Sequence, residues 1–272
     1  MSLAQLPSNW REWLTLNIER GCAKSDLLRD MDNGGIPRKV ALDALLEITG
    51  ESIPTLVPLP QLDLRHRCAR FEMNDPRVVL IDDFLQAEEC DALVRLGQRS
   101  LQDSAVVDQD TGQSVQHPAR TGSLAFMKPG SHLIDSIEAR VASLLQWPLA
   151  SIEHLQVIGY EPSEEYRAHH DCFDDSSDGA AVHLSRGGQR VGTLLMYLHA
   201  PEGGGATRFP QLGDWQIKPQ RGSALWFQNV RPDGKPDPRL LHAGEPVTQG
   251  VKWVCTAWVR ESTWRHRETP ES

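Results

Sequence analysis

The sequence has 272 residues, of which 39% are hydrophobic and 24% are charged, which is enough for one large domain or two smaller ones and excludes a chain that is disordered throughout. The net charge of −9 and the pI near 5.6 argue against a phosphate backbone as the main partner, because proteins that bind nucleic acid usually present a basic face. Five scattered cysteines without C-x-x-C spacing indicate neither a disulfide framework nor a zinc ribbon.

The N-terminus, MSLAQLPSNWREW, lacks the basic and apolar regions of a signal peptide. No run of the sequence approaches the roughly 18 apolar residues that span a membrane. Together with the cysteine pattern, these features predict a cytoplasmic protein that has neither a membrane nor a nucleic acid as its partner.

Three short helices are predicted in the first 50 residues. The segments NWREWLTLNIERG, KSDLLRDMDNGG and PRKVALDALLEITG have helical spacing, and each ends at glycine. The prolines of the following stretch, ESIPTLVPLPQ, predict an extended linker. We therefore expect a helical module over residues 1–60 and a second domain over residues 61–272.

The apolar stripe of Trp10, Trp13 and Leu14 in the first helix needs a surface that covers it. We expect this stripe to pack on the second domain or on a second subunit, which would make the protein a homo-oligomer through its N-terminal helices. A partner-docking or lid module is the alternative.

The second domain begins with a buried strand, RVVLIDDFL, and two amphipathic helices, QAEECDALVRLGQRSL and SHLIDSIEARVASLLQW. Short strand-like segments follow, separated by Gly, Pro, Asp and Asn: HLQVIGY, GTLLMYLHA, ATRFP, WQIKP, SALWF and KWVCTAWVR. This order predicts a sandwich or barrel. We expect residues 203–205 to make a tight turn between strands, and the acidic stretch after Asp171 to be a solvated loop, since it lacks the pattern of a calcium loop.

Two histidines and a carboxylate lie side by side in YRAHHDCFDD, residues 166–175. In an extended segment His169 and Asp171 would project to the same face, while His170 points away. His242 in RLLHAGEPV is the candidate for a third ligand. Two histidines and one carboxylate on one face of an octahedral metal leave three open positions, as in non-haem Fe(II) oxygenases. A solvated polar turn is the alternative, because H-x-D often occurs by chance.

The last predicted strand alternates between two kinds of face. Its first face would carry Val251, Trp253, Cys255, Ala257 and Val259, and its second Lys252, Val254, Thr256, Trp258 and Arg260. Because the first face is wholly apolar, we expect the second to turn Lys252 into a cavity. A buried ammonium needs an anionic partner, and a dicarboxylate cosubstrate would supply one. A surface lysine on an edge strand is the alternative.

Five separated motifs occur in order: Y-x-x-H-x-D at 166–171, R-x-x-T-x-L-M-Y-L at 190–198, E-G-G-G-A-T-x-F-P at 202–210, G-S-A-L-W-F at 222–227 and L-H-A-G-x-P-V-x-x-G-x-K-W-V at 241–254. Together they resemble the prolyl 4-hydroxylase group of Fe(II)/2-oxoglutarate dioxygenases. The resemblance covers roughly residues 77–262 and includes D-D-F-L-x-x-x-E-C-D at 82–91, but it does not extend to the N-terminal helices.

This resemblance implies a mainly β fold with flanking helices (α+β), a double-stranded β-helix or jelly-roll barrel. The implied Fe(II) ligands are His169, Asp171 and His242. The distal carboxylate of 2-oxoglutarate would pair with Lys252, and Thr207 or Tyr160 would add hydrogen bonds. The residues that would line the substrate side are Tyr166, Arg190, Trp258 and Arg260, although relatives often have histidine at the position of Arg260.

The implied reaction consumes O₂ and 2-oxoglutarate, releases succinate and CO₂, and hydroxylates an unactivated C–H bond, with ascorbate as an expected stimulant. We expect a proline-like substrate, either a free amino acid such as proline or pipecolate or a proline residue in a peptide. The two arginines favour the free acid slightly, because a guanidinium can hold a carboxylate by two hydrogen bonds. The alternative functions are a demethylase that acts on nucleic acid or protein, and a non-catalytic binding protein built on a barrel.

Overall fold

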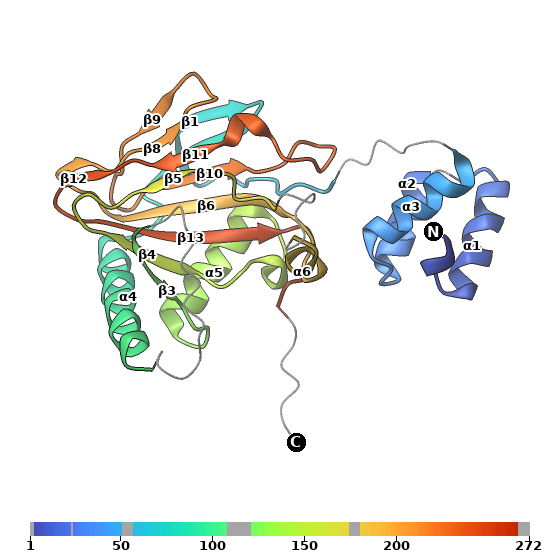
Figure 1. The fold of residues 1–272 in the computed structure, drawn as a ribbon, viewed down its shortest axis with the longest axis horizontal. Coiled ribbons are helices and arrows are strands. Elements are labelled where there is room, and N and C mark those ends of the chain that lie inside the picture. The colour runs from blue at the N-terminus through green and yellow to red at the C-terminus, as the bar shows by residue number, and fades with distance from the viewer. Residues whose placement is uncertain (1–2, 23, 51–56, 108–120, 174–179, 266–272) are drawn as a thin grey trace. The chain divides into compact units, whose positions relative to one another are not determined.

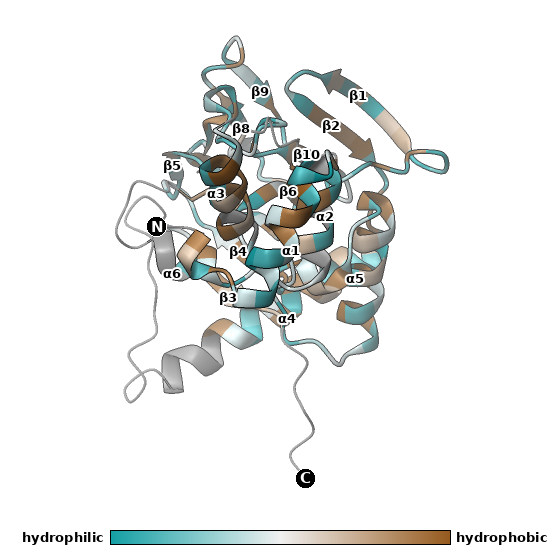
Figure 2. Cartoon of the chain, turned by 90° about the vertical axis from the view of Figure 1, so that its right-hand side faces the viewer, coloured by the Kyte–Doolittle hydropathy of each residue, from teal (hydrophilic) through white to brown (hydrophobic). Residues whose placement is uncertain are grey.

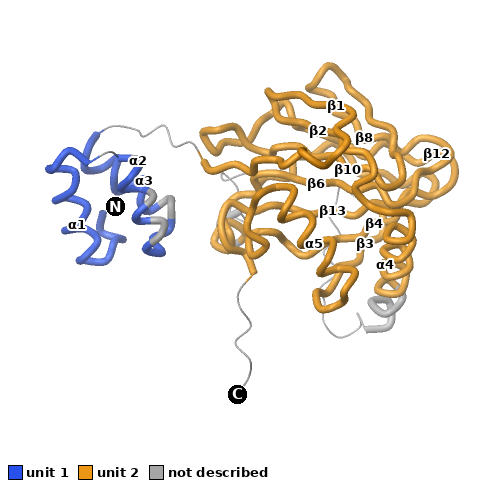
Figure 3. Tube along the Cα trace, turned by 180° about the vertical axis from the view of Figure 1, so that it is seen from behind, with its two compact units in different colours: residues 1–56 blue, residues 57–272 orange. Residues whose placement is uncertain are grey.

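The computed structural model describes residues 3–22, 24–50, 57–107, 121–173 and 180–265. The chain divides into two compact units, residues 1–56 and residues 57–272 (Figure 3). Among the described residues no helix is both long enough and apolar enough to cross a membrane. All five cysteines are free.

The first unit is a bundle of three helices, α1 (Ser8–Glu19), α2 (Lys24–Asn33) and α3 (Arg38–Thr49), preceded by the short turn η1 (Leu3–Gln5). Its core includes Leu14, which is fully buried, and Trp10 and Trp13 pack against that core with their rings edge to face at 5.1 Å. The unit therefore covers part of the apolar stripe that we expected to require another surface.

The second unit contains two sheets and a ribbon, and every strand pair is antiparallel. The order in the large sheet is β1 (Cys68–Asn74), β2 (Arg77–Asp82), β10 (Ala224–Gln228), β6 (Arg190–His199), β13 (Lys252–Arg260), β4 (Gln156–Tyr160) and β3 (Ser123–Phe126). The order in the small sheet is β5 (Tyr166–His169), β11 (His242–Gly244), β8 (Thr207–Phe209) and β9 (Trp215–Ile217). The ribbon pairs β12 (Val247–Gln249) with β7 (Gly203–Gly204).

Two apolar layers hold the second unit together. Helices α4 (Ala87–Val107) and α5 (His132–Leu145) lie against the outer face of the large sheet (Figure 1), and their Leu93 and Ile137 share one buried cluster with Cys255 of β13. The second cluster lies between the two sheets, where Val254 of β13 joins Phe209 of β8. The central residues of β2 are buried, and Figure 2 shows most of this strand in the hydrophobic colour.

The predicted alternation of the last strand is confirmed in β13. The side chains at 253, 255, 257 and 259 belong to the cluster under the helices, and those at 252, 254, 256 and 258 line a pocket between the sheets. The predicted fold class is also confirmed as mainly β with flanking helices. However, the described strands form two facing sheets and a ribbon instead of one closed barrel.

Several local expectations need correction. Two strands of the large sheet, β1 and β3, lie where we predicted no strand. The glycines expected to make a tight turn instead form β7 and continue into Gly205, whose φ is 69°. The expected acidic loop falls largely on residues 174–179, which lie outside the described residues. The short helix α6 (Ala180–Ser185) follows them, and the turns η2 (Leu149–Ser151) and η3 (Pro238–Leu240) complete the unit.

Candidate functional site

The structure brings His169, Asp171 and His242 together. His169 ends β5 and His242 begins β11, and the antiparallel register of these strands places the two histidines directly opposite each other. Asp171 follows two residues after His169, and its Oδ1 lies 3.4 Å from His169 Nε2 while its Oδ2 lies 3.6 Å from His242 Nε2. One ligand atom from each residue lies within 4.8 Å of the others. His170 is exposed and does not line the pocket.

The hydrogen bonds of both imidazoles fit a metal ligand set. His169 Nδ1 lies 2.8 Å from the carbonyl oxygen of Arg167, and His242 Nδ1 lies 3.0 Å from that of Leu240. A carbonyl oxygen only accepts, so Nδ1 carries the proton in each ring and Nε2 presents its lone pair to the site. Burial lowers the pKa of His242 to about 4, so this ring is neutral and able to bind a metal near neutral pH.

The carboxylate of Asp171 supplies the negative charge of the set. Its side chain is 5% exposed, and burial alone would raise its pKa. The neighbouring imidazoles and the hydroxyl of Thr193 outweigh that cost and hold the pKa of Asp171 below its ordinary value. Two nitrogen donors and one ionised oxygen donor match the preference of Fe(II), so these residues fit the metal that the motifs imply.

Lys252 stands at the other end of the same pocket. It is 3% exposed, and burial lowers its pKa to about 8. Its Nζ lies 5.5 Å from the centre of the Tyr160 ring, because Tyr160 and Lys252 are paired residues of β4 and β13. Gly205 leaves room for the lysine stem, since a Cβ there would lie 3.3 Å from Lys252 Cδ. A buried cation of this kind is suited to a ligand carboxylate.

The remaining predicted residues divide into two groups. Thr207 and Tyr160 line the pocket, and Thr207 Oγ1 accepts a hydrogen bond of 2.8 Å from the hydroxyl of Tyr197. Tyr166 and Trp258 line it as well, and the ring of Tyr166 stacks on that of His169 with the centroids 3.5 Å apart.

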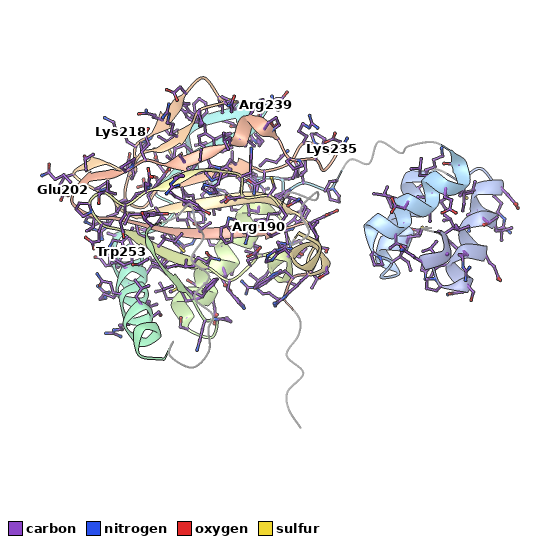
Figure 4. The ribbon with its side chains drawn as sticks, in the orientation of Figure 1. Arg190, Glu202, Lys218, Lys235, Arg239 and Trp253 are labelled. Carbon is purple, nitrogen blue, oxygen red and sulfur yellow. The ribbon has the colours of Figure 1, made fainter. Side chains whose placement is uncertain are left out.

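Arg190 and Arg260, in contrast, do not line the pocket. Arg190, labelled in Figure 4, donates two hydrogen bonds to Glu153, of 2.7 and 2.9 Å. Arg260 is 2% exposed and donates to Glu153 and to the backbone carbonyl oxygens of His183, Arg186 and Gly188. The sequence correctly assigned Arg260 to the second face of the strand, but its guanidinium is bound by protein groups.

Sequence reasoning missed a polar residue that contacts the candidate metal site. Thr193 on β6 lines the pocket and donates a hydrogen bond of 2.7 Å to Asp171 Oδ2. The available signal was a single hydroxyl in the otherwise apolar centre of RVGTLLMYLH. Glu153, the partner of both arginines, gave no signal because it lies just before a predicted strand like many surface carboxylates.

The pocket as a whole combines two histidines and a carboxylate at one end with a buried lysine at the other. Its walls also include the apolar side chains of Ile158, Leu195, Val254 and Phe227. A jelly-roll with this arrangement defines a metal-dependent dioxygenase that uses a 2-oxo acid.

Comparison with known proteins identifies the family. The model of the 2OG-Fe(II) oxygenase superfamily matches residues 155–260. Prolyl 4-hydroxylase 1 of Arabidopsis thaliana is 39% identical over 201 residues, which cover 68% of this chain and 69% of that protein. Prolyl 4-hydroxylase 2 of the same plant is 33% identical over 237 residues, covering 79% and 78%.

A solved structure gives the same result. The viral collagen prolyl hydroxylase of Paramecium Bursaria Chlorella virus-1, in its complex with 2OG, is 31% identical and superposes with a TM-score of 0.53, covering 67% of this chain and 95% of that one. The chain therefore belongs to the prolyl 4-hydroxylase-like Fe(II)/2-oxoglutarate-dependent dioxygenases. Its cofactor is Fe(II), and its cosubstrates are 2-oxoglutarate and O₂.

Proposed function

We propose that this enzyme hydroxylates a proline residue within a peptide or protein, and that free proline is not its substrate. The names of its relatives, which include a collagen prolyl hydroxylase, support a prolyl substrate. The choice between peptide and free amino acid rests on the charges of the pocket. One observation carries it: among the described pocket residues, Lys252 is the sole lysine or arginine.

The argument follows from the number of carboxylates that the pocket must hold. The distal carboxylate of 2-oxoglutarate would occupy Lys252, so a second carboxylate, from a free amino acid, would be buried without a cation. The two arginines that favoured the free acid both bind Glu153. A proline residue inside a peptide replaces that carboxylate with a neutral carbonyl group, which needs only a hydrogen-bond donor.

The pocket offers such a donor. Trp258 lines it, and its buried Nε1 has no acceptor among the residues that the structure describes. A buried N–H without a partner is costly, and a peptide carbonyl oxygen of the substrate would satisfy it. The apolar side chains of the walls suit the ring of proline.

The residues then have separate tasks in the reaction. His169, Asp171 and His242 would hold Fe(II), which supplies the activation of O₂ when it is bound. Lys252 would fix 2-oxoglutarate by its distal carboxylate, with Thr207 and Tyr160 beside it. Trp258 and Tyr166 would orient the substrate ring, and the apolar walls keep bulk water away from the reacting atoms.

A screen for succinate formation tests this proposal. The purified enzyme with Fe(II) and 2-oxoglutarate is offered proline-containing peptides, free L-proline and free L-pipecolate, and mass spectrometry follows the gain of one oxygen. We expect peptides to be hydroxylated and both free acids to be inert. Hydroxylation of free proline that disappears when its carboxylate is esterified would contradict the peptide assignment. No succinate formation with any peptide or amino acid would favour the demethylase or binding-protein alternatives.

A further inference from the structure

A chain of two hydrogen bonds leads from the body of the large sheet to the proposed metal ligand Asp171. Thr193 lies on β6, next to the central strands β10 and β13, and is 1% exposed. Its Oγ1 lies 2.7 Å from Asp171 Oδ2 and 3.0 Å from Asn229 Nδ2. All three side chains are buried, so water does not compete for these bonds.

The position of Asn229 is fixed from both sides. It directly follows β10, its backbone N–H donates to the carbonyl oxygen of Val191 at 2.9 Å, and its carbonyl oxygen accepts from Asp237 at 3.0 Å. These two bonds fix the backbone of Asn229 to two neighbouring segments. From this position its side-chain amide reaches Thr193. Asn229 is also only 3% exposed, so the surrounding residues confine its side chain.

The chemistry of the groups sets the direction of the chain. The NH₂ group of an amide only donates, so Thr193 Oγ1 accepts from Asn229. The single hydroxyl proton of Thr193 is then left for Asp171, and an ionised carboxylate only accepts. The bonds therefore run from Asn229 to Thr193 to Asp171, and one oxygen of the carboxylate, Oδ2, is held in a defined place.

We propose that Thr193 and Asn229 are positioning residues that hold the Asp171 carboxylate in the orientation in which it binds Fe(II). This inference rests on the proposed role of Asp171 as a metal ligand. A carboxylate can turn about its last side-chain bond, and the two histidines cannot prevent that turn because they are ligands themselves. Thr193 supplies the missing constraint, and Asn229 ensures that its hydroxyl points toward Asp171 and not away from it.

The first test measures metal affinity without turnover. Full-length, metal-free protein is titrated with Co²⁺, whose visible absorption reports the geometry of its ligands, and with Fe²⁺ under anaerobic conditions. Thr193→Val keeps the shape of the side chain but removes the hydroxyl, and we expect about 10- to 100-fold weaker binding, as is common when a group that orients a metal ligand is lost. Thr193→Ser keeps the hydroxyl and should restore both the affinity and the Co²⁺ spectrum.

The second test asks whether Asn229 acts through Thr193. Asn229→Leu should weaken Co²⁺ binding less than Thr193→Val, and the double variant should bind no more weakly than Thr193→Val alone, because the two residues form one chain. Thr256→Val is the matched control, since Thr256 is a buried pocket residue that, within the described part of the chain, makes no hydrogen bond to Asp171. Its Co²⁺ affinity should equal that of the wild-type protein.

The outcomes separate this inference from the proposed function. If Thr193→Val binds Co²⁺ as tightly as the wild type, the inference is wrong. A lower thermal stability of the metal-free variant with that unchanged affinity would show that Thr193 is merely structural. Additive losses in the double variant would overturn the role of Asn229. A wild-type protein that binds neither metal would instead contradict the proposed function itself.

Discussion

Replacing Lys252 with methionine tests the other end of the pocket. Methionine has nearly the length of the lysine stem but no charge, so the apolar contacts of the side chain are largely kept. Lys252 is 3% exposed, so a bound carboxylate would meet its ammonium group almost free of water. A hydrogen bond between charged groups contributes about 1.5 to 3 kcal/mol, and about 1.4 kcal/mol corresponds to a factor of ten. We therefore expect Lys252→Met to weaken 2-oxoglutarate binding by about 10- to 150-fold.

The assay is a calorimetric titration of Mn²⁺-loaded protein with 2-oxoglutarate, together with the apparent KM for 2-oxoglutarate during turnover. Lys218→Met is the matched control, because Lys218 is exposed and does not line the pocket (Figure 4). The affinity of Lys218→Met for 2-oxoglutarate should match that of the wild-type protein. An unchanged affinity in Lys252→Met would refute the assignment of Lys252 as the partner of the distal carboxylate.

The same lysine predicts how stability depends on pH. Burial lowers the pKa of Lys252 to about 8 from an ordinary value of 10.5. Between these values the unfolded chain binds the proton and the folded chain does not, so the free energy of unfolding rises with pH. The rise amounts to about 3 kcal/mol between pH 8 and 10.5 in protein without ligand. Denaturant unfolding should show it in the wild type and not in Lys252→Met, which should already be the more stable protein at pH 7.

Three further predictions concern the metal, the buried ion cluster and the division of the chain. His242→Ala should abolish metal-dependent succinate formation, and turnover at the wild-type rate would remove His242 from the ligand set. Glu153→Gln should lower the free energy of unfolding by about 3 to 5 kcal/mol, because it leaves the charge of buried Arg260 uncompensated, and unchanged denaturant midpoints would contradict this. A chain that begins at Val57 should still bind Co²⁺ with unchanged affinity, because the three residues of the candidate metal site all lie within the second unit; a loss of binding would show that the helical unit supports the site.

The sequence predicted the parts of the site that depend on local periodicity. The two-residue period of a strand was enough to place Lys252 and Trp258 on one face of β13, and to pair His169 with Asp171. It could not show how His242 reaches them. That contact depends on the register between β5 and β11, which are far apart in the chain, and no local pattern encodes such pairing.

The hydrogen bonds that lead to Asp171 were hidden for a similar reason. Thr193 lies on β6 and Asn229 directly follows β10, and they meet because these strands are neighbours in the sheet. In the sequence Thr193 is a single polar residue in an apolar strand, and Asn229 follows Gln228 at the start of a polar loop. A polar side chain in a buried strand indicates that a partner exists, but the partner itself becomes visible only when the strand order is known.

Arg260 shows where periodicity alone gives the wrong role. It lies on the same face of β13 as Lys252, but eight residues further along, which at about 3.3 Å per residue is roughly 26 Å away. The pocket ends before that point, and the guanidinium binds Glu153 and three backbone carbonyl oxygens, two of them just beyond α6.

The buried ion cluster of Glu153, Arg190 and Arg260 nevertheless reaches the pocket wall. Glu153 also binds Arg190, whose guanidinium lies 3.4 Å from the centre of the Trp258 ring. Since Trp258 lines the pocket, Glu153 and Arg190 support that wall from behind. Arg260 also donates to Glu153, so hydrogen bonds through Glu153 and Arg190 connect it to the pocket wall although its own side chain does not line the pocket.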